Sequence, residues 1–149
     1  MTAEALLSAS DIAKTYGTTK VLHGVDLSVN PGESVAILGQ SGSGKTTLLS
    51  ILAGLEPPDR GGVRFLGRNI GDLKPDALAR LRGERMGIIF QEYHLVPSLT
   101  ARENVTLPLE ILGRAGKAAK ADALLERVGL GKRGHHYPHQ LSGGEQQRV

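Results

Sequence analysis

The residues with the clearest chemical meaning form a glycine-rich stretch in the first third of the chain. Residues 39–46 read Gly-Gln-Ser-Gly-Ser-Gly-Lys-Thr and match the pattern G-x-x-x-x-G-K-[ST]. Glycine permits positive φ and a close approach, so backbone N–H groups of such a loop can surround a phosphate. Lys45 would add positive charge at the β- and γ-phosphates, and the Thr46 hydroxyl could bind Mg²⁺. The expected nucleotide-binding residues are Gly39, Gln40, Ser41, Gly42, Ser43, Gly44, Lys45, Thr46 and Thr47.

A second segment, Leu141-Ser-Gly-Gly-Glu-Gln146, has the spacing of a helix capping box. Ser142 and the N–H groups of Gly143 and Gly144 would form another anion-binding helix start. Taken alone, the segment would be an ordinary N-capped helix after a loop. Its presence in the same chain as the phosphate loop favours anion binding.

The elements around the phosphate loop are predicted to alternate between strands and helices, as in an α/β fold. The apolar run 34–38 predicts a buried strand that leads into the loop, and residues 45–53 predict the helix that leaves it. The other expected elements of this half are strands over 5–16, 21–30 and 63–70, a helix over 75–85 and a buried strand over 86–90.

The second half of the chain is predicted to be helical. Thr100-Ala-Arg-Glu103 should start a helix that Pro108 kinks or ends early. Residues 117–128 are amphipathic, and Gly129 is placed as their C-cap. The apolar face of that helix is expected to carry Ala121, Leu124, Leu125 and Val128. We therefore predict an N-terminal β region plus phosphate-loop core over 1–91 and a helical subdomain over 92–149.

Composition excludes several classes of protein. The chain has 149 residues, 40% of them hydrophobic and 22% charged, which argues against disorder. A net charge of +3 is too small to indicate nucleic-acid binding, and the absence of Cys excludes disulfides, Cys-zinc sites and thiol catalysis. The first residues lack the basic segment of a secretory signal, and no apolar run approaches about 18 residues, so we expect a soluble, cytoplasmic domain.

One histidine pattern invites a metal-site interpretation. His135, His136 and His139 read His-His-x-x-His, but Pro138 breaks any helix there and no carboxylate stands at helical spacing. We expect a solvated loop leading into the second segment.

With the phosphate loop and the Leu141–Gln146 segment together, the chain resembles the ATP-binding cassette (ABC) ATPases from end to end. The second segment resembles their signature motif, and residues 87–105 resemble their Q-loop and the helical segment after it. The resemblance is nearest to lipoprotein-release, macrolide-efflux and YbbA-like exporters, in which the cassette pairs with a membrane permease. It implies an α/β fold with a P-loop NTPase core, partial in this chain, an N-terminal antiparallel β region and a helical subdomain.

The resemblance also implies roles for particular residues. Tyr16 would stack on adenine, and Gln91 would contact Mg²⁺ or the attacking water and report the nucleotide state to the membrane partner. The signature would bind the γ-phosphate of ATP held by a second, identical cassette. Its residues are Ser142, Gly143, Gly144, Glu145 and Gln146. The implied ligands are ATP and Mg²⁺, and the implied partner is an integral membrane permease at the inner face of the cell membrane, with no nucleic acid.

The chain departs from the family pattern in one respect. Family members continue after the signature into a Walker B strand with an Asp and a Glu, a D-loop and a switch His, and residues 1–149 hold no counterpart. Glu92 and Glu145 do not stand in for them, so we expect a C-terminally truncated cassette whose isolated chain hydrolyses ATP negligibly. The alternatives are a non-catalytic nucleotide-binding fragment and a non-transport ABC ATPase. The latter class usually carries coiled-coil insertions or Cys-rich modules, whereas 50 positions separate Gln91 from Leu141 and Cys is absent.

Overall fold

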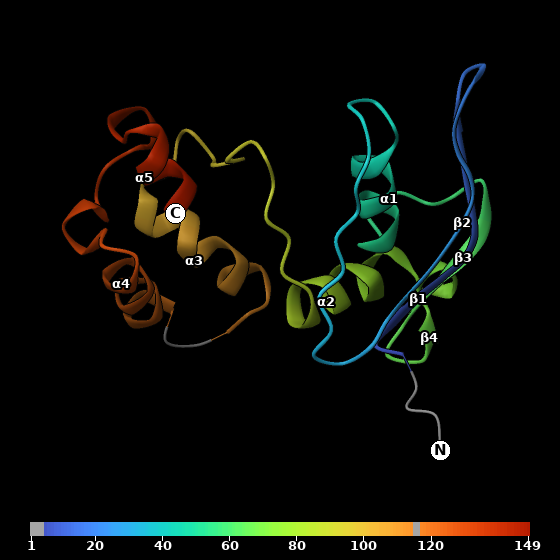
Figure 1. Ribbon diagram of the computed structural model, residues 1–149. Helices are drawn as coiled ribbons and strands as arrows, with labels where there is room; N and C mark the ends of the chain where they lie inside the picture. The colour runs from blue at the N-terminus through green and yellow to red at the C-terminus, as the bar shows by residue number, and fades with distance from the viewer. Residues whose placement is uncertain (1–4, 115–116) are drawn as a thin grey trace. The chain divides into compact units, whose positions relative to one another are not determined.

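The computed structural model describes residues 5–114 and 117–149 and divides the chain into two compact units (Figure 1). The first unit ends at Met86 and the second spans Gly87–Val149. The boundary predicted from the sequence lies after residue 91, so the observed division places Gln91 in the second unit.

The first unit contains a four-stranded antiparallel sheet in the order β2-β1-β3-β4 (Figure 1). The tight turn after Tyr16 joins the two long strands, and the Leu66-Gly67 turn joins the two short ones. The strands are β1 (Leu7–Tyr16), β2 (Thr19–Val29), β3 (Arg60–Phe65) and β4 (Arg68–Asn69). The structure confirms the N-terminal antiparallel β region.

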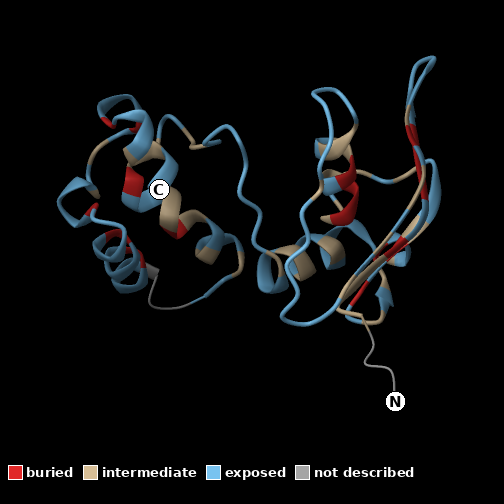
Figure 2. Cartoon of the chain, in the orientation of Figure 1, coloured by how far each residue is buried: buried red, intermediate tan, exposed pale blue. Residues whose placement is uncertain are grey.

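The helix α1 (Lys45–Leu52) packs its apolar side against this sheet and thereby seats the phosphate loop. Ile12 of β1 and Ile51 of α1 are 0% and 1% exposed, and each fully buried Ile side chain contributes about 1.5–3 kcal/mol. Figure 2 shows the buried residues on the strands and on α1. The other buried members of this cluster are Ala9, Leu22, Leu48, Leu52, Val63, Phe65 and Ile70.

The rest of the first unit is a short 3₁₀ turn, η1 (Ile70–Asp72), and the helix α2 (Pro75–Arg85). Pro75 occupies the first helical turn, where its missing N–H costs no hydrogen bond. The helix is tied to the end of α1 because the Arg82 guanidinium donates to the Gly54 carbonyl at 2.7 Å.

Two strand predictions are wrong. Residues 34–38 and 86–90 form no strand, and Leu38 and Ile89 are 89% and 96% exposed. An apolar run becomes a strand only when a neighbour completes its hydrogen-bond ladder. Within residues 5–114 and 117–149, all strand pairing lies among β1–β4.

The second unit is helical, as predicted. Its helices are α3 (Ala101–Ile111), α4 (Lys117–Arg127) and α5 (Gly143–Arg148), with 3₁₀ turns η2 (Gly131–Arg133) and η3 (Pro138–Gln140). The Thr100–Glu103 capping box starts α3 as expected. Of the two expected effects of Pro108, a kink or an early end, the early end is wrong, because α3 continues to Ile111. Pro108 lies at an exposed position, where water can satisfy the carbonyl that it leaves unbonded.

The core of the second unit is small. Ala101 and Ala121 are 0% exposed, Leu125 and Leu130 are 1% exposed, and Leu141 is also buried. Of the residues predicted for the apolar face of α4, Ala121 and Leu125 are buried, whereas Leu124 and Val128 are partly exposed and line a pocket with Val105 and the end of α5.

The predicted C-cap of α4 is confirmed. The Gly129 N–H donates to the Glu126 carbonyl at 3.0 Å, and the Leu130 N–H donates to the Leu125 carbonyl at 2.7 Å.

No helix among the described residues has both the length and the apolar character needed to cross a bilayer.

Candidate functional site

The phosphate loop lies directly before α1, where helix N–H groups are free to bind an anion. Gly44 is the N-cap of α1 and has a φ of +84°. Within the described residues, no capping side chain occupies the first N–H groups of the helix, and the first turn contains no acidic residue. The helix dipole and the unpaired N–H groups therefore favour a negative ligand at this end.

Gly44 is the residue that lets the loop approach β2 closely. A Cβ at this position would lie 2.8 Å from Val21 Cγ1 and 2.9 Å from Leu22 Cδ2, and the positive φ disfavours other residues. The loop is therefore seated against the β1–β2 hairpin.

Lys45 reaches back over the loop that precedes it. Its Nζ donates to the Gly39 carbonyl at 3.0 Å and to the Gln40 carbonyl at 2.6 Å. An ammonium has three N–H donors, so one remains for a ligand. The Lys45 charge is thus held next to the loop's own N–H groups.

The oxygen donors predicted for Mg²⁺ occupy two separate units. Thr46 is exposed in the first turn of α1, and Gln91 is exposed in the second unit. A hydroxyl and a side-chain amide oxygen are hard ligands that suit Mg²⁺. The donor chemistry therefore fits this ion.

Tyr16 ends β1 and is 46% exposed. Its hydroxyl donates to Glu56 Oε2 at 2.7 Å, and the other Glu56 oxygen pairs with the Lys14 ammonium at 2.9 Å. The hydrogen bond to Glu56 is the main cause that raises the pKa of Tyr16, whereas the Thr47 hydroxyl opposes it. Thr47 belongs to the first turn of α1, so the phenol lies close to the phosphate loop.

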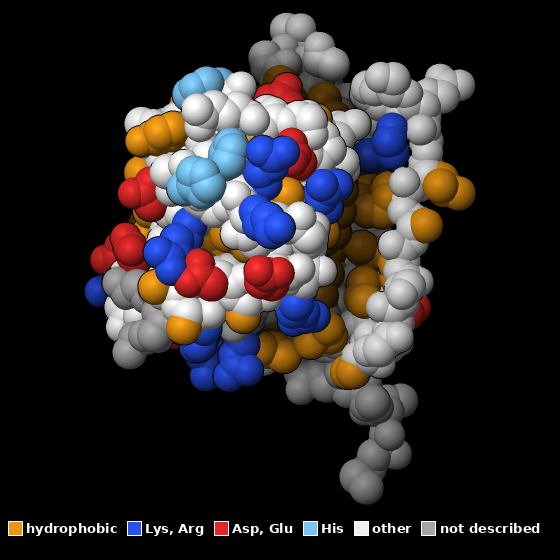
Figure 3. All heavy atoms as spheres, turned by 90° about the vertical axis from the view of Figure 1, so that its left-hand side faces the viewer, with side chains coloured by type: hydrophobic (Ala, Val, Ile, Leu, Met, Phe, Trp, Pro, Cys, Tyr) orange, Lys and Arg blue, Asp and Glu red, His pale blue; other side chains and the backbone are white. Residues whose placement is uncertain are grey.

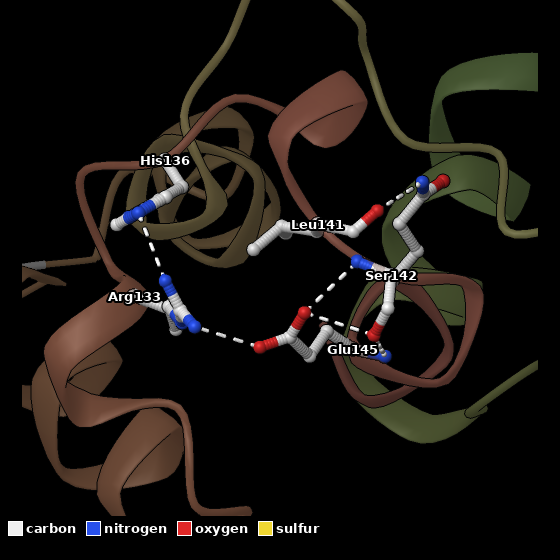
Figure 4. A network of polar contacts seen from close by, with 6 residues as sticks. Arg133, His136, Leu141, Ser142 and Glu145 are labelled. Carbon is white, nitrogen blue, oxygen red and sulfur yellow. Dashed lines mark hydrogen bonds and ion pairs between the residues drawn. The ribbon is translucent and has the colours of Figure 1, made fainter.

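The signature segment begins α5 with a complete capping box (Figure 4). Glu145 Oε2 accepts hydrogen bonds from the Ser142 N–H and the Ser142 hydroxyl, both at 2.8 Å. The Arg133 Nε pairs with Glu145 Oε1 at 3.2 Å, while its Nη1 contacts His136 Nε2 at 3.2 Å. Arg133 therefore links the start of the signature helix to the histidine loop.

A further contact involves the segment after Gln91. Gly143 lies against the Tyr93 hydroxyl so closely that a Cβ there would be 3.0 Å from Tyr93 Oη. The amide of Gln146 donates to the Leu141 carbonyl at 3.0 Å. The structure thus brings Tyr93, two positions after Gln91, against Gly143.

The histidine loop is only partly solvated. His135 and His139 are exposed, but His136 is half-buried, and its carbonyl accepts the Ala101 N–H at 2.8 Å. Within the described residues no group of His, Cys, Asp and Glu side chains could hold a metal ion. The face in Figure 3 carries side chains of both charges interspersed with histidines.

Reasoning from the sequence missed three residues that contact the predicted site. Lys14 and Glu56 contact Tyr16, and Arg133 contacts Glu145. Glu56 is separated from Tyr16 by 40 positions, and no local spacing rule connects residues so far apart.

The capping carboxylate of α5 should make stability depend on pH. Hydrogen bonds from the Ser142 backbone and hydroxyl lower the pKa of Glu145 below its ordinary value of 4.5. The unfolded chain then binds the proton more readily, so this contribution is present above about pH 4.5 and is lost as pH falls through the folded value. We expect Glu145→Gln to unfold at lower urea concentration than the parent chain at neutral pH and to lose less stability on acidification.

Urea unfolding at several pH values between about 6 and 3.5 measures this difference. Glu110→Gln, which removes an exposed carboxylate from α3, is the matched control. Parallel pH curves for the parent chain and Glu145→Gln would contradict the assignment.

Comparison with known proteins gives consistent results. The family described as ABC transporter matches residues 22–149. The pyoverdine export ATP-binding/permease protein PvdT of Pseudomonas entomophila is 50% identical over 151 aligned positions, which cover 97% of this chain and 23% of that protein. The macrolide export ATP-binding/permease protein MacB 1 of Aeromonas hydrophila is 51% identical, covering 98% of this chain and 24% of that protein.

Solved structures match as well. The dimeric structure of a post-hydrolysis state of the ATP-binding cassette MJ0796, bound to ADP and Pi, superposes with a TM-score of 0.87 at 37% identity. It covers 95% of this chain and 66% of that one. For comparison, the chain spans about a quarter of the length of the two curated relatives, PvdT and MacB 1. The match confirms the α/β P-loop fold class expected from the sequence, with part of the cassette represented.

Proposed function

Because the chain belongs to the ABC transporter family, we propose that it binds MgATP as the nucleotide-binding part of an exporter. The observation that carries this proposal is the phosphate loop before α1, with the Lys45 ammonium held on the carbonyls of Gly39 and Gln40. The site combines a full positive charge with free helix N–H groups, which is the requirement for binding a triphosphate.

The remaining predicted residues take the following roles in this proposal. Tyr16 stacks on the adenine, and the backbone of residues 39–44 wraps the phosphates. Thr46 and Gln91 are the proposed Mg²⁺ ligands, and the ion would neutralise charge on the β- and γ-phosphates. Lys45 and the N–H groups of α1 orient the terminal phosphate.

Transport requires a second cassette and a membrane partner. We propose a homodimer in which Ser142, Gly143 and Gly144 of each chain contact the γ-phosphate of ATP held by the other. Closure around ATP would act on a permease through the region of Gln91, at the inner face of the cell membrane. We propose a lipoprotein, lipid or hydrophobic compound as the exported substrate. Relatives named as export ATP-binding/permease proteins for pyoverdine and macrolides support export as the direction of transport.

Hydrolysis is proposed for the closed dimer of the whole protein. Phosphoryl transfer to water needs a positioned water and charge stabilisation in one closed site. Residues 1–149 contain the phosphate loop but no candidate for the Walker B carboxylates. The isolated 149-residue chain should therefore bind ATP without turning it over.

Isothermal titration of the 149-residue chain with ATP and Mg²⁺ tests this proposal, together with an assay of phosphate release. We expect saturable binding that weakens when Mg²⁺ is chelated, and phosphate release no faster than in a blank without protein. A chain that binds no ATP would refute nucleotide binding. Lys45-dependent phosphate release would refute the expectation of inactivity. If the protein purifies together with a membrane permease, the result would favour the transporter hypothesis over the alternative of a non-transport ABC ATPase.

A further inference from the structure

A compact polar cluster surrounds the hydroxyl of Tyr16. The cluster consists of Lys14, Tyr16, Glu56 and Asp59, contributed by β1 and by the segment between α1 and β3. The Lys14 side chain is only 10% exposed, although it is charged. A cation so well covered needs close partners, and here it has them.

The Lys14 ammonium is surrounded by three acceptors, the two carboxylates of the cluster and the Pro57 carbonyl. It donates to the Pro57 carbonyl at 2.7 Å, contacts Glu56 Oε1 at 2.9 Å and lies 3.5 Å from Asp59 Oδ1. It also lies over the Tyr16 ring, 5.6 Å from the centroid, within the range of a cation–π contact. One side of the ring is therefore occupied by Lys14.

The two carboxylates of the cluster share Lys14 but differ in their other partners. Asp59 binds the backbone: its carboxylate accepts the Thr15 N–H at 2.7 Å, and its own N–H donates to the Ala13 carbonyl at 2.9 Å. Glu56 instead binds side chains, with one oxygen on Lys14 and the other on the Tyr16 hydroxyl. Asp59 thus ties the segment to β1, whereas Glu56 acts on the phenol.

We propose that Glu56, held by Lys14, is a positioning residue that fixes the Tyr16 ring so that its open face is preset for a nucleobase. This inference rests on the proposed nucleotide binding and assigns Glu56 to the base rather than to the phosphates. A ring fixed before binding loses less rotamer freedom when the base stacks on it. The pKa of Glu56 is lowered first by the Tyr16 hydrogen bond and then by Lys14, which agrees with a charged carboxylate in these contacts.

The test compares two ligands that share phosphates but differ in the base, namely ATP and inorganic tripolyphosphate. We expect Glu56→Ala to weaken ATP binding about 3- to 10-fold, the effect of one aromatic contact, and to leave tripolyphosphate binding unchanged within about 1.5-fold. Glu56→Gln retains an acceptor for the phenol and should recover most of the ATP affinity.

A double-mutant cycle separates positioning from folding. Tyr16→Phe keeps the ring but removes the hydroxyl that Glu56 accepts, so Glu56→Ala should have little additional effect on ATP affinity in that background. Unfolding midpoints of all variants show whether the first unit remains folded. Full additivity of the two substitutions would overturn the inference.

The remaining outcomes are distinct. Equal weakening of ATP and tripolyphosphate by Glu56→Ala would mean that Glu56 supports the whole site, and would overturn the inference. A parent chain that binds tripolyphosphate as tightly as ATP would also overturn it, while phosphate binding would stand. A parent chain that binds neither ligand would remove the proposed function and this inference together.

Discussion

Replacing Lys45 with alanine is expected to weaken ATP binding by about 10- to 100-fold, the range for losing hydrogen bonds to a charged group. The substitution removes the ammonium that is proposed to lie next to the terminal phosphates. It also uncovers the carbonyls of Gly39 and Gln40, which now accept from Lys45 Nζ and would then face the ligand's negative charge. Both effects act in the same direction.

Titration calorimetry with ATP measures this loss. Lys74→Ala is the matched control. Lys74 is an exposed lysine of the same unit, at the N-cap of α2, and its side chain makes no capping hydrogen bond there. The control should bind ATP like the parent chain. Tripolyphosphate should lose affinity with Lys45→Ala as strongly as ATP does, because both ligands carry the phosphates that Lys45 is proposed to contact. A loss below about two-fold would contradict the assigned role of Lys45.

Among the variants proposed in this chain, Gly61→Ala is expected to lower the free energy of unfolding most, by about 2–5 kcal/mol. Gly61 lies in β3 at φ +89°, opposite the register shift between Ser10 and Ala13 of β1. A Cβ at this position would overlap the carbonyl oxygens of Ser10 and Asp11. The clash is with the backbone of β1, which cannot move aside without breaking its pairing with β3.

Gly62→Ala provides an internal control one residue away. A Cβ there would meet only Asn69 Oδ1, at 3.9 Å, and we expect a change within about 0.5–1 kcal/mol. Urea unfolding, followed by circular dichroism, measures both variants. Similar stabilities for Gly61→Ala and Gly62→Ala would show that β1 and β3 do not approach each other as described. The loss matters for function because β1 carries Tyr16 and supports α1.

The sequence by itself determined the features whose signals are local. The phosphate loop is read from eight consecutive residues, and the capping boxes at Thr100 and Ser142 need only a partner three positions ahead. Pro75 and Gly129 mark a helix start and a helix end through their own backbone preferences. Such interactions form within one turn, so they depend little on the rest of the fold.

Strands outside the β1–β4 sheet were predicted wrongly for a physical reason. The apolar runs 34–38 and 86–90 have the composition of buried strands, but composition supplies no hydrogen-bond partner. In the described residues these runs remain unpaired, and Leu38 and Ile89 are largely exposed. A strand is a property of two segments, and only one of them is visible in a local pattern.

Tertiary structure alone decided which side chains support the predicted site. Glu56 reaches Tyr16 because the segment after α1 returns to the end of β1, and Arg133 reaches Glu145 because η2 lies beside the start of α5. Neither pair has a characteristic spacing, since the distance along the chain is set by whatever elements lie between. The sequence predicted the residues that are proposed to bind a nucleotide, whereas packing determined which side chains contact them. Chain folding brings together groups that local chemistry cannot connect.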